Sequence, residues 1–176
     1  MQEVSVIIPN FNGMAYLDGV LAGLECQTVN NFEVILVDNG SSDGSCAFVA
    51  ARYPWVHLIE LPENFGFCKA VNEGIKASRA PYVLLLNNDI EVTENFIEEM
   101  ISAIRRHPKA FSCAARMIQF HDRDKLDDAG NYYCALGWAY ARGKGKDIHT
   151  YEKEEKIFSS CAGAAIYRKK IFDKIG

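Results

Sequence analysis

Residues 82–89 read Tyr82-Val83-Leu84-Leu85-Leu86-Asn87-Asn88-Asp89, an apolar run that passes directly into three polar residues. A continuous apolar run of this length is typical of a strand buried on both faces of a parallel sheet. Because Asn and Asp are poor strand formers, the strand should end at Leu86. Asp89 would then follow the carboxyl end of a central strand, where open α/β sheets bind ligands, and its carboxylate would suit a hard divalent cation with a phosphate. Taken alone, the three polar residues favour a simpler interpretation, an Asx turn that closes the strand.

Strands and helices alternate through the first part of the chain. β-Branched and apolar runs predict further strands at residues 4–8, 32–38 and 56–61, the first of them stopped by Pro9. Apolar residues at helical spacing predict four helices, the last capped by Thr93, at residues 14–26, 47–53, 67–78 and 93–104. This alternation predicts an α/β fold with a mostly parallel, doubly wound sheet and helices on both faces.

The pattern changes after residue 105. One or two strands are expected within residues 111–120, and residues 121–156 are polar and rich in glycine, which predicts a long functional or mobile loop. A further strand is expected within residues 157–167, followed by a helix over residues 168–175 that Gly176 would cap.

The composition is that of one soluble domain. The chain has 176 residues, of which 49% are hydrophobic, and its net charge of −4 gives no reason to expect nucleic acid as a partner. The six cysteines are scattered without a C-x-x-C pair, which favours reduced, packed thiols. We find no signal peptide, and no apolar run approaches the roughly 18 residues that cross a bilayer. A cytoplasmic location is therefore expected.

Polar residues follow each of the four predicted strands. They are Pro9–Asn12, Asp38 with Asn39 and Gly40, Asn64–Gly66, and Asn87–Asp89. Each group alone is ordinary turn chemistry, and Asn72, inside a predicted helix, is alone explained by solvation. Because parallel strands bring their carboxyl ends to one edge of a sheet, the groups together predict a ligand site there.

Other signatures of nucleotide or hydrolytic chemistry are absent from the sequence. There is no G-x-x-x-x-G-K-[ST] loop, no G-x-G-x-x-G turn after a strand and no G-x-S-x-G elbow. The four histidines are isolated, without the spacing of a metal pair. These absences disfavour P-loop enzymes, dinucleotide-binding enzymes and α/β-hydrolases.

The groups at the strand ends, in this order and spacing, resemble the nucleotide-sugar-dependent glycosyltransferases of family 2, and more closely its rhamnosyltransferase-like branch. The resemblance extends over nearly the whole chain, including Asp128-Ala129-Gly130 and Cys161–Gly176. It implies a GT-A-type fold, with residues 1–105 as the nucleotide-binding half. Residues 106–176 would begin the acceptor-side half, incomplete at its C-terminal side.

The resemblance also implies roles for individual residues. Four residues would line the nucleotide base, with Phe11 stacking on it: Pro9, Asn10, Phe11 and Asn12. Asp38 would hydrogen-bond the base, while three residues would lie beside the ribose and diphosphate: Asn64, Gly66 and Asn72. Asn87 and Asn88 would contact the donor, and Asp89 would hold Mg²⁺ or Mn²⁺. On the acceptor side the resemblance implies Asp128, Gly163 and Ala164.

The sequence departs from the family pattern in two ways. The motif at residues 87–89 has one carboxylate where two are usual, so metal binding should depend on the nucleotide. The acidic pair that supplies the general base in the family is expected beyond Gly176, which predicts that residues 1–176 are inactive alone. Asp127 and Asp128 are the nearest internal candidates, and we do not favour them.

The predicted function is an inverting transfer of sugar from a UDP- or dTDP-sugar to a glycan or lipid-linked acceptor, assisted by a metal. Such a protein would build a microbial surface glycan at the inner face of the membrane, with peripheral membrane association. The main alternative is a non-catalytic nucleotide-sugar binding module. A sugar-nucleotide pyrophosphorylase is disfavoured because the loop after Ile8 lacks a basic residue, and a flavodoxin-like module explains neither Asn64–Asn72 nor the second half.

Overall fold

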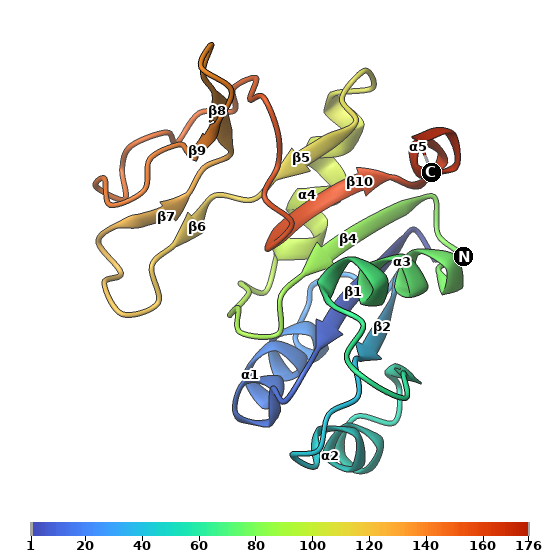
Figure 1. The fold of residues 1–176 in the computed structure, drawn as a ribbon. Coiled ribbons are helices and arrows are strands. Elements are labelled where there is room, and N and C mark those ends of the chain that lie inside the picture. The colour runs from blue at the N-terminus through green and yellow to red at the C-terminus, as the bar shows by residue number, and fades with distance from the viewer. Residues whose placement is uncertain (1, 176) are drawn as a thin grey trace.

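A six-stranded sheet forms the centre of the protein (Figure 1). The computed structural model describes residues 2–175, so Gly176, the expected helix cap, lies outside the described residues. The strand order is β3-β2-β1-β4-β10-β5, and the four strands β1 to β4 run parallel. The strands are β1 (Val4–Asn10), β2 (Phe32–Asp38), β3 (His57–Glu60), β4 (Tyr82–Leu86), β5 (Ser112–Ala114) and β10 (Ala164–Arg168). Strand β10 pairs antiparallel with both β4 and β5, so within the described residues it alone runs against the other strands of this sheet. The mostly parallel α/β sheet predicted from sequence is therefore confirmed.

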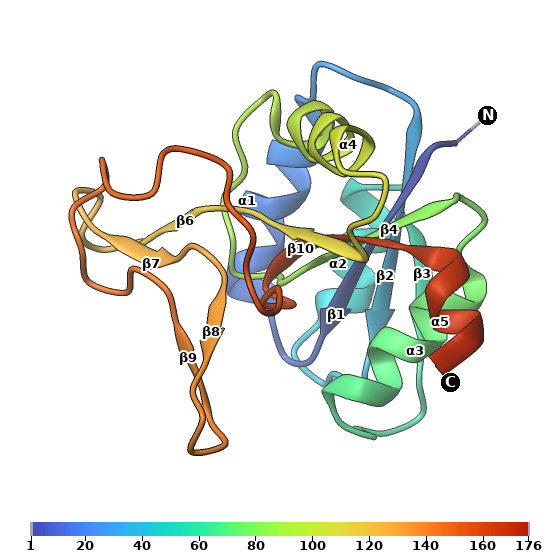
Figure 2. The ribbon, with the colours of Figure 1, turned by 90° about the horizontal axis from the view of Figure 1, so that it is seen from above.

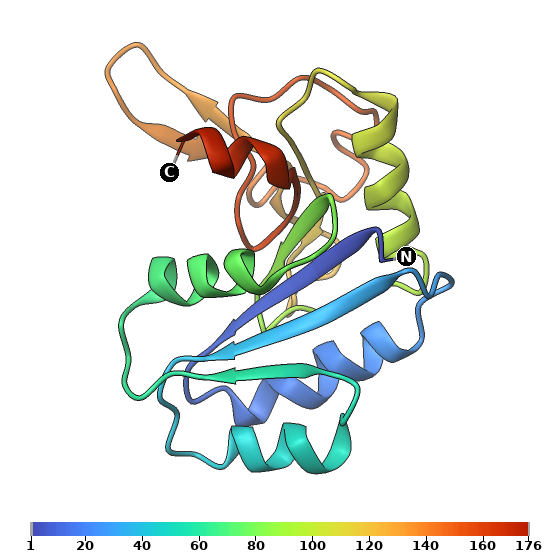
Figure 3. The ribbon, with the colours of Figure 1, turned by 90° about the vertical axis from the view of Figure 1, so that its right-hand side faces the viewer.

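Helices cover both faces of this sheet (Figure 3). One face carries α1 (Met14–Glu25), α2 (Ser45–Arg52) and α4 (Phe96–Arg106). The other carries α3 (Phe67–Ala77) and α5 (Lys169–Ile175). The sheet is therefore doubly wound, as the alternation of elements predicts.

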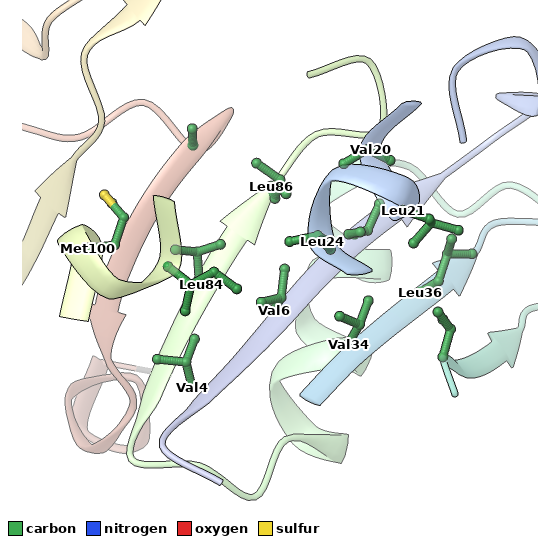
Figure 4. Packing of buried hydrophobic residues seen from close by; sticks show 14 of the residues in the cluster. Val4, Val6, Val20, Leu21, Leu24, Val34, Leu36, Leu84, Leu86 and Met100 are labelled. Carbon is green, nitrogen blue, oxygen red and sulfur yellow. The ribbon is translucent and has the colours of Figure 1, made fainter. Parts of the chain in front are cut away.

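Strand β4 contributes to the hydrophobic cores on both faces of the sheet. Leu84 and Leu86 belong to the core under α1 and α4, whereas Val83 and Leu85 belong to the core under α3. Figure 4 shows Leu84 and Leu86 among the side chains of the first core, with α1 lying over the neighbouring strands. Side chains alternate across a strand, so both alternate sets must be apolar. This is why the sequence of β4 is a continuous apolar run, and each fully buried leucine contributes about 1.5–3 kcal/mol.

Strand β1 continues past Pro9, contrary to the prediction that Pro9 stops it. Pro9 pairs in register with Val37 of β2, and the pairing of β1 with β4 ends earlier, at Ile7. The carbonyl oxygen of Asn10 accepts a hydrogen bond from the backbone N–H of Asn39, so the backbone of Asn10 faces β2. Because the backbone groups of successive residues in a strand point to opposite neighbours, the nitrogen of Pro9 faces β4, with which pairing has already ended. Proline therefore removes no ladder hydrogen bond here.

Helix α4 is capped from a distance rather than by Thr93. Its N-cap position is Asn95, which makes no side-chain capping bond. The buried side chain of Gln27 supplies the bonds instead: its Oε1 accepts from Ile97 N at 2.9 Å, and its Nε2 donates to Thr93 O at 2.8 Å and Gly23 O at 2.9 Å. This long-range cap joins the end of α1 to the start of α4.

Residues 115–160 fold beside the main sheet (Figures 1 and 2). The polar stretch 121–156, predicted as a loop, contains three short strands, β7 (Leu126–Asp128), β8 (Asn131–Tyr133) and β9 (Ala139–Ala141). Strand β7 pairs antiparallel with β6 (Met117–Ile118), which lies where a strand was expected, and β8 pairs antiparallel with β9. Strands of two or three residues are too short for alternation to be recognised in sequence. No helix within residues 2–175 has the length and apolar character needed to span a membrane.

Gln27→Ala should lower the free energy of unfolding by about 1–3 kcal/mol, because it leaves buried backbone groups of α4 without partners. Chemical denaturation with urea measures the change. Thr28→Ala is the matched control, since the Thr28 hydroxyl makes only an exposed bond to Glu98. A loss for Gln27→Ala no larger than for Thr28→Ala would show that Gln27 is not the cap.

Candidate functional site

The carboxyl ends of β1 and β4 form the topological switch point of the sheet. The chain proceeds from β1 outward to β2 and β3, then returns to place β4 on the opposite side of β1. Loops leaving adjacent strands in opposite directions open a crevice, which is where α/β sheets of this kind bind ligands.

A chain of side-chain hydrogen bonds crosses this switch point. Asn88 Nδ2, after β4, donates to Asn10 Oδ1 at 2.7 Å. Asn10 Nδ2, at the end of β1, donates to Asp38 Oδ1 at 2.8 Å. Asn10 and Asp38 are both 2% exposed, so the bonds form in a setting where an unpaired polar group is costly. The structure therefore brings together the ends of β4, β1 and β2 through three of the predicted site residues.

The Asp38 carboxylate is held by several donors. Besides Asn10, Ser41 donates its backbone N–H to Oδ2 at 2.8 Å and its hydroxyl to Oδ1 at 2.6 Å. Burial alone would raise the pKa of Asp38, but the hydrogen bonds from Ser41 and Asn10 outweigh it and hold that pKa below its usual range. Burial and the neighbouring Asp38 raise the pKa of the Cys46 thiol to about 12. Asp38 is thus an ionised group that only accepts hydrogen bonds.

The loop after β1 is fastened to the loop after β2. Asn12 has a left-handed backbone, φ 50°, and its N–H donates to Ser41 Oγ at 2.8 Å. Its side-chain oxygen accepts from Ser42 N at 2.9 Å. Between these fixed points Phe11 is 47% exposed. The ring is therefore presented to solvent by a rigid loop rather than packed in the core.

Asn39 fixes the third loop, the one after β3. Its Nδ2 donates to Asn64 Oδ1 at 2.8 Å, and its Oδ1 accepts from Phe65 N at 3.0 Å. Gly66, with φ +85°, donates its N–H to Asn64 Oδ1 at 2.9 Å. Asn64 and Gly66 are thereby linked to the residue next to Asp38. Asn72 lies exposed in the second turn of α3 and has no hydrogen bond to these groups within residues 2–175, so its place in the site remains a prediction.

Two supporting residues of the site, Gly13 and Ser41, were not predicted, and Asn39 was predicted only as a member of the polar group that follows β2. Asn39 and Ser41 stand directly after Asp38, and the only sequence signal was their turn chemistry. At Gly13 a Cβ atom would lie 2.1 Å from Asn88 Nδ2 and 2.3 Å from Asn10 Oδ1. Contacts between residues so distant in the sequence cannot be inferred from either segment alone.

Asp89 stands at the surface, just outside this network. Asn88 and Asp89 form a turn after β4, and Asp89 is exposed. Within residues 2–175 no group of three or more His, Cys, Asp or Glu side chains could hold a metal ion. A cation at Asp89 would therefore have a single carboxylate ligand, as the sequence predicts, and would need oxygen ligands from a bound molecule.

The predicted acceptor-side residues do not lie together. Gly163 and Ala164 lie beside the end of β4: Asn87 N donates to Gly163 O at 2.8 Å, and Ala164 pairs with Leu86. Asp128 is instead 4% exposed in β7, where Oδ1 accepts from Gly130 N and Oδ2 has no partner in the described residues. Burial raises the pKa of Asp128. No described hydrogen bond joins Asp128 to the network of Asn10.

Comparison with known proteins decides the family. The sequence profile of "Glycosyl transferase family 2" matches residues 5–176. The chain belongs to glycosyl transferase family 2. One curated relative is glycosyltransferase GlyG of Streptococcus pneumoniae, which is 30% identical over 133 residues, covering 74% of this chain and 42% of GlyG.

Two solved structures share the fold of this chain. TarS 1-349 of S. aureus, in complex with UDP-GlcNAc, has a TM-score of 0.72 at 20% identity, covering 98% of this chain and 47% of that one. The mannosyltransferase PcManGT of Pyrobaculum calidifontis, in complex with GDP-Man and Mn²⁺, has a TM-score of 0.70 at 16% identity, covering 99% and 46%. The predicted GT-A-type fold is confirmed, and the chain spans less than half the length of these family 2 and structural relatives.

Gly13→Ala should destabilise the protein by about 1–3 kcal/mol, because the added methyl group overlaps the Asn88–Asn10 bond. Gly19→Ala is the matched control: Gly19 lies within α1, the helix whose N-cap is Gly13, and its Cβ would meet nothing within 4 Å. The control should instead stabilise the protein by about 0.5–1 kcal/mol, since alanine is the better helix former. Urea denaturation measures both, and equal effects of the two substitutions would contradict the close packing at Gly13.

Proposed function

We propose that this edge of the sheet binds a nucleotide-sugar donor, and that the chain is the donor-binding part of an inverting glycosyltransferase. The observation that carries the proposal is the bonded chain Asp38–Asn10–Asn88 across the switch point. These hydrogen bonds hold the ends of β1, β2 and β4 in fixed positions, and members of this family act on sugar donors. The bound UDP-GlcNAc of TarS and the GDP-Man of PcManGT support a donor of the same chemical class.

The character of Asp38 favours a uracil or thymine base. An ionised carboxylate can only accept, and both of these bases carry an N3–H donor, whereas N3 of cytosine is an acceptor. Phe11 offers an exposed ring for stacking on the base. The donor is therefore proposed to be a UDP- or dTDP-sugar.

The residues at 87–89 fit a divalent cation that a diphosphate helps to hold. Asp89 supplies an exposed carboxylate, and the Oδ1 of Asn88 has no hydrogen-bond partner within residues 2–175. Hard oxygen ligands of this kind suit Mg²⁺ or Mn²⁺, and PcManGT was solved with Mn²⁺. When bound, such an ion neutralises the charge that develops on the departing diphosphate. Asn10 keeps Asn88 oriented for this role, and Asp89 would supply the carboxylate that holds the ion.

The acceptor is proposed to be a glycan or a lipid-linked sugar, in a surface-glycan pathway. Within residues 2–175 neither Asp127 nor Asp128 suits the removal of the acceptor proton, because Asp127 pairs with Lys144 at 3.4 Å and Asp128 is buried. A general base must lie within hydrogen-bond reach of the proton it removes. We therefore infer that residues 2–175 bind the donor without transferring the sugar, and the rhamnosyl specificity stays a prediction.

Asp89→Asn should abolish the effect of Mn²⁺ on UDP binding. Calorimetric titration of the unsubstituted chain should show UDP binding strengthened by Mn²⁺, about tenfold or more, equivalent to about 1.4 kcal/mol. Glu91→Gln is the matched control, because Glu91 is exposed two residues away and pairs with Arg123. Equal UDP affinity in Mn²⁺ and in EDTA would contradict the metal site, and no UDP binding at all would contradict the proposed function.

Asp38→Asn should reduce the preference for UDP over CDP, by roughly tenfold, because the new amide can donate as well as accept. The affinities of both nucleotides, measured by calorimetry on each variant, give the preference. Glu60→Gln is the control, since Glu60 is an exposed carboxylate opposite Asp38 in the register of β2 and β3. An unchanged preference in Asp38→Asn would remove Asp38 from the base site.

A further inference from the structure

The hairpin β8–β9 projects from the side of the molecule and exposes large apolar side chains. Figure 2 shows it extending away from the main sheet and its helices. Leu136 at the tip is 77% exposed and Trp138 is 59% exposed. Tyr133 and Tyr140 on the two strands are each 53% exposed. Exposed apolar groups gathered on one feature of a monomer mark an interaction site.

The sequence of this hairpin contains no charge. Residues 129–141 include no Asp, Glu, Lys, Arg or His, in a chain of which 24% of residues are charged. A solvated hairpin ordinarily carries charged or strongly polar side chains at its turn, and this turn is Cys134-Ala135-Leu136-Gly137-Trp138. The composition therefore suits an apolar or interfacial environment rather than bulk water.

Aromatic side chains lie on both faces of the hairpin. Tyr132 and Tyr140 are paired in register and their ring centroids are 5.5 Å apart. Tyr133 faces the opposite way, because side chains alternate along a strand, and its ring stacks on Phe158 at 4.7 Å. A flat protein partner would cover one face of the hairpin and leave the other face exposed to water. Insertion into an apolar or interfacial medium covers the tip and both faces of the hairpin together.

We propose that the β8–β9 hairpin inserts its tip into the interfacial region of a lipid bilayer. Trp and Tyr are the residues that favour this region, because their rings are apolar while their N–H or O–H groups reach water and headgroups. Leu136 extends beyond them toward the acyl chains. The contact would hold the chain at the membrane surface without a spanning helix, and it does not require that the chain bind a nucleotide.

The base of the hairpin carries the groups expected at headgroup depth. Lys144 and Lys146 follow β9 directly and are exposed. Lys144 lies 3.4 Å from Asp127, and Lys146 donates to the Tyr151 hydroxyl at 3.1 Å. Arg142 is buried and paired with Glu155, and Asp147 lies nearby in the sequence. Because acidic groups offset much of this basic charge, insertion of the apolar tip dominates and lysine contacts to lipid phosphates are secondary.

Tryptophan fluorescence tests the proposal directly, because the chain has only two tryptophans. Trp55→Phe leaves Trp138 as the only tryptophan. Its emission should shift to the blue as vesicles of phosphatidylcholine, with or without phosphatidylglycerol, are added without nucleotide. Leu136→Asp in the same background should weaken the partition coefficient at least tenfold. Ile175→Asp is the matched control, since Ile175 is 64% exposed on α5, away from the hairpin (Figure 1), and it should leave partitioning unchanged.

Three results would overturn the proposal. The first is an emission maximum that vesicles do not change. The second is a blue shift that depends on protein concentration without lipid, which would show that copies of the chain pair through the hairpin. The third is binding that requires phosphatidylglycerol and is insensitive to Leu136→Asp, which would show surface attraction of the lysines without insertion. Because nucleotide is absent, a failure to bind UDP would bear on the proposed function alone.

Discussion

The side-chain amide of Asn10 is the interaction on which the candidate site depends. It is buried at the end of the central strand β1, donates to Asp38 on β2 and accepts from Asn88 beyond β4. A buried amide that lost either partner would carry an uncompensated polar group, at a cost of about 1–3 kcal/mol. The three loops that leave these strands are therefore not independent. Ser41 and Asn39 extend the same bonding to the loops after β1 and β3, so the whole edge is held by side chains rather than by packing.

This rigidity suits the flexible, charged donor that we propose for this edge of the sheet. Groups held in place before the ligand arrives lose little entropy when they bind it. Phe11 is exposed between fixed neighbours, and Asp89 is exposed after a strand whose residues pack into both cores. The apolar run of β4 and the polar residues after it therefore act together. The run packs into both cores and fixes the strand, so that the turn after it holds the Asp89 carboxylate at a defined position in solvent.

Much of the fold of residues 2–105 could be predicted from sequence because its signals are local. Strand β4 has to be apolar on both faces, and the order of strands follows from their alternation with helices. What could not be predicted depends on contacts between distant residues. Pro9 is tolerated because β4 stops pairing at Ile7, and Gln27 caps a helix that begins about 70 residues later in the chain. The strands β7 to β9 are too short to be recognised, so the buried position of Asp128 at the end of β7 could not be predicted from the sequence.

The direction of the hydrogen bonds explains why position 88, within the motif at residues 87–89, is not a carboxylate. Asp38 is ionised and only accepts, so Asn10 has to turn its NH₂ group toward Asp38 and its oxygen toward residue 88. An aspartate at position 88 would meet that oxygen with a second acceptor. Asn88 meets it with a donor at 2.7 Å and keeps its own oxygen free. The charge of Asp38, two strands away, therefore requires a hydrogen-bond donor at position 88, which an ionised aspartate cannot provide. Asp89 lies outside the network, so its negative charge costs the network nothing.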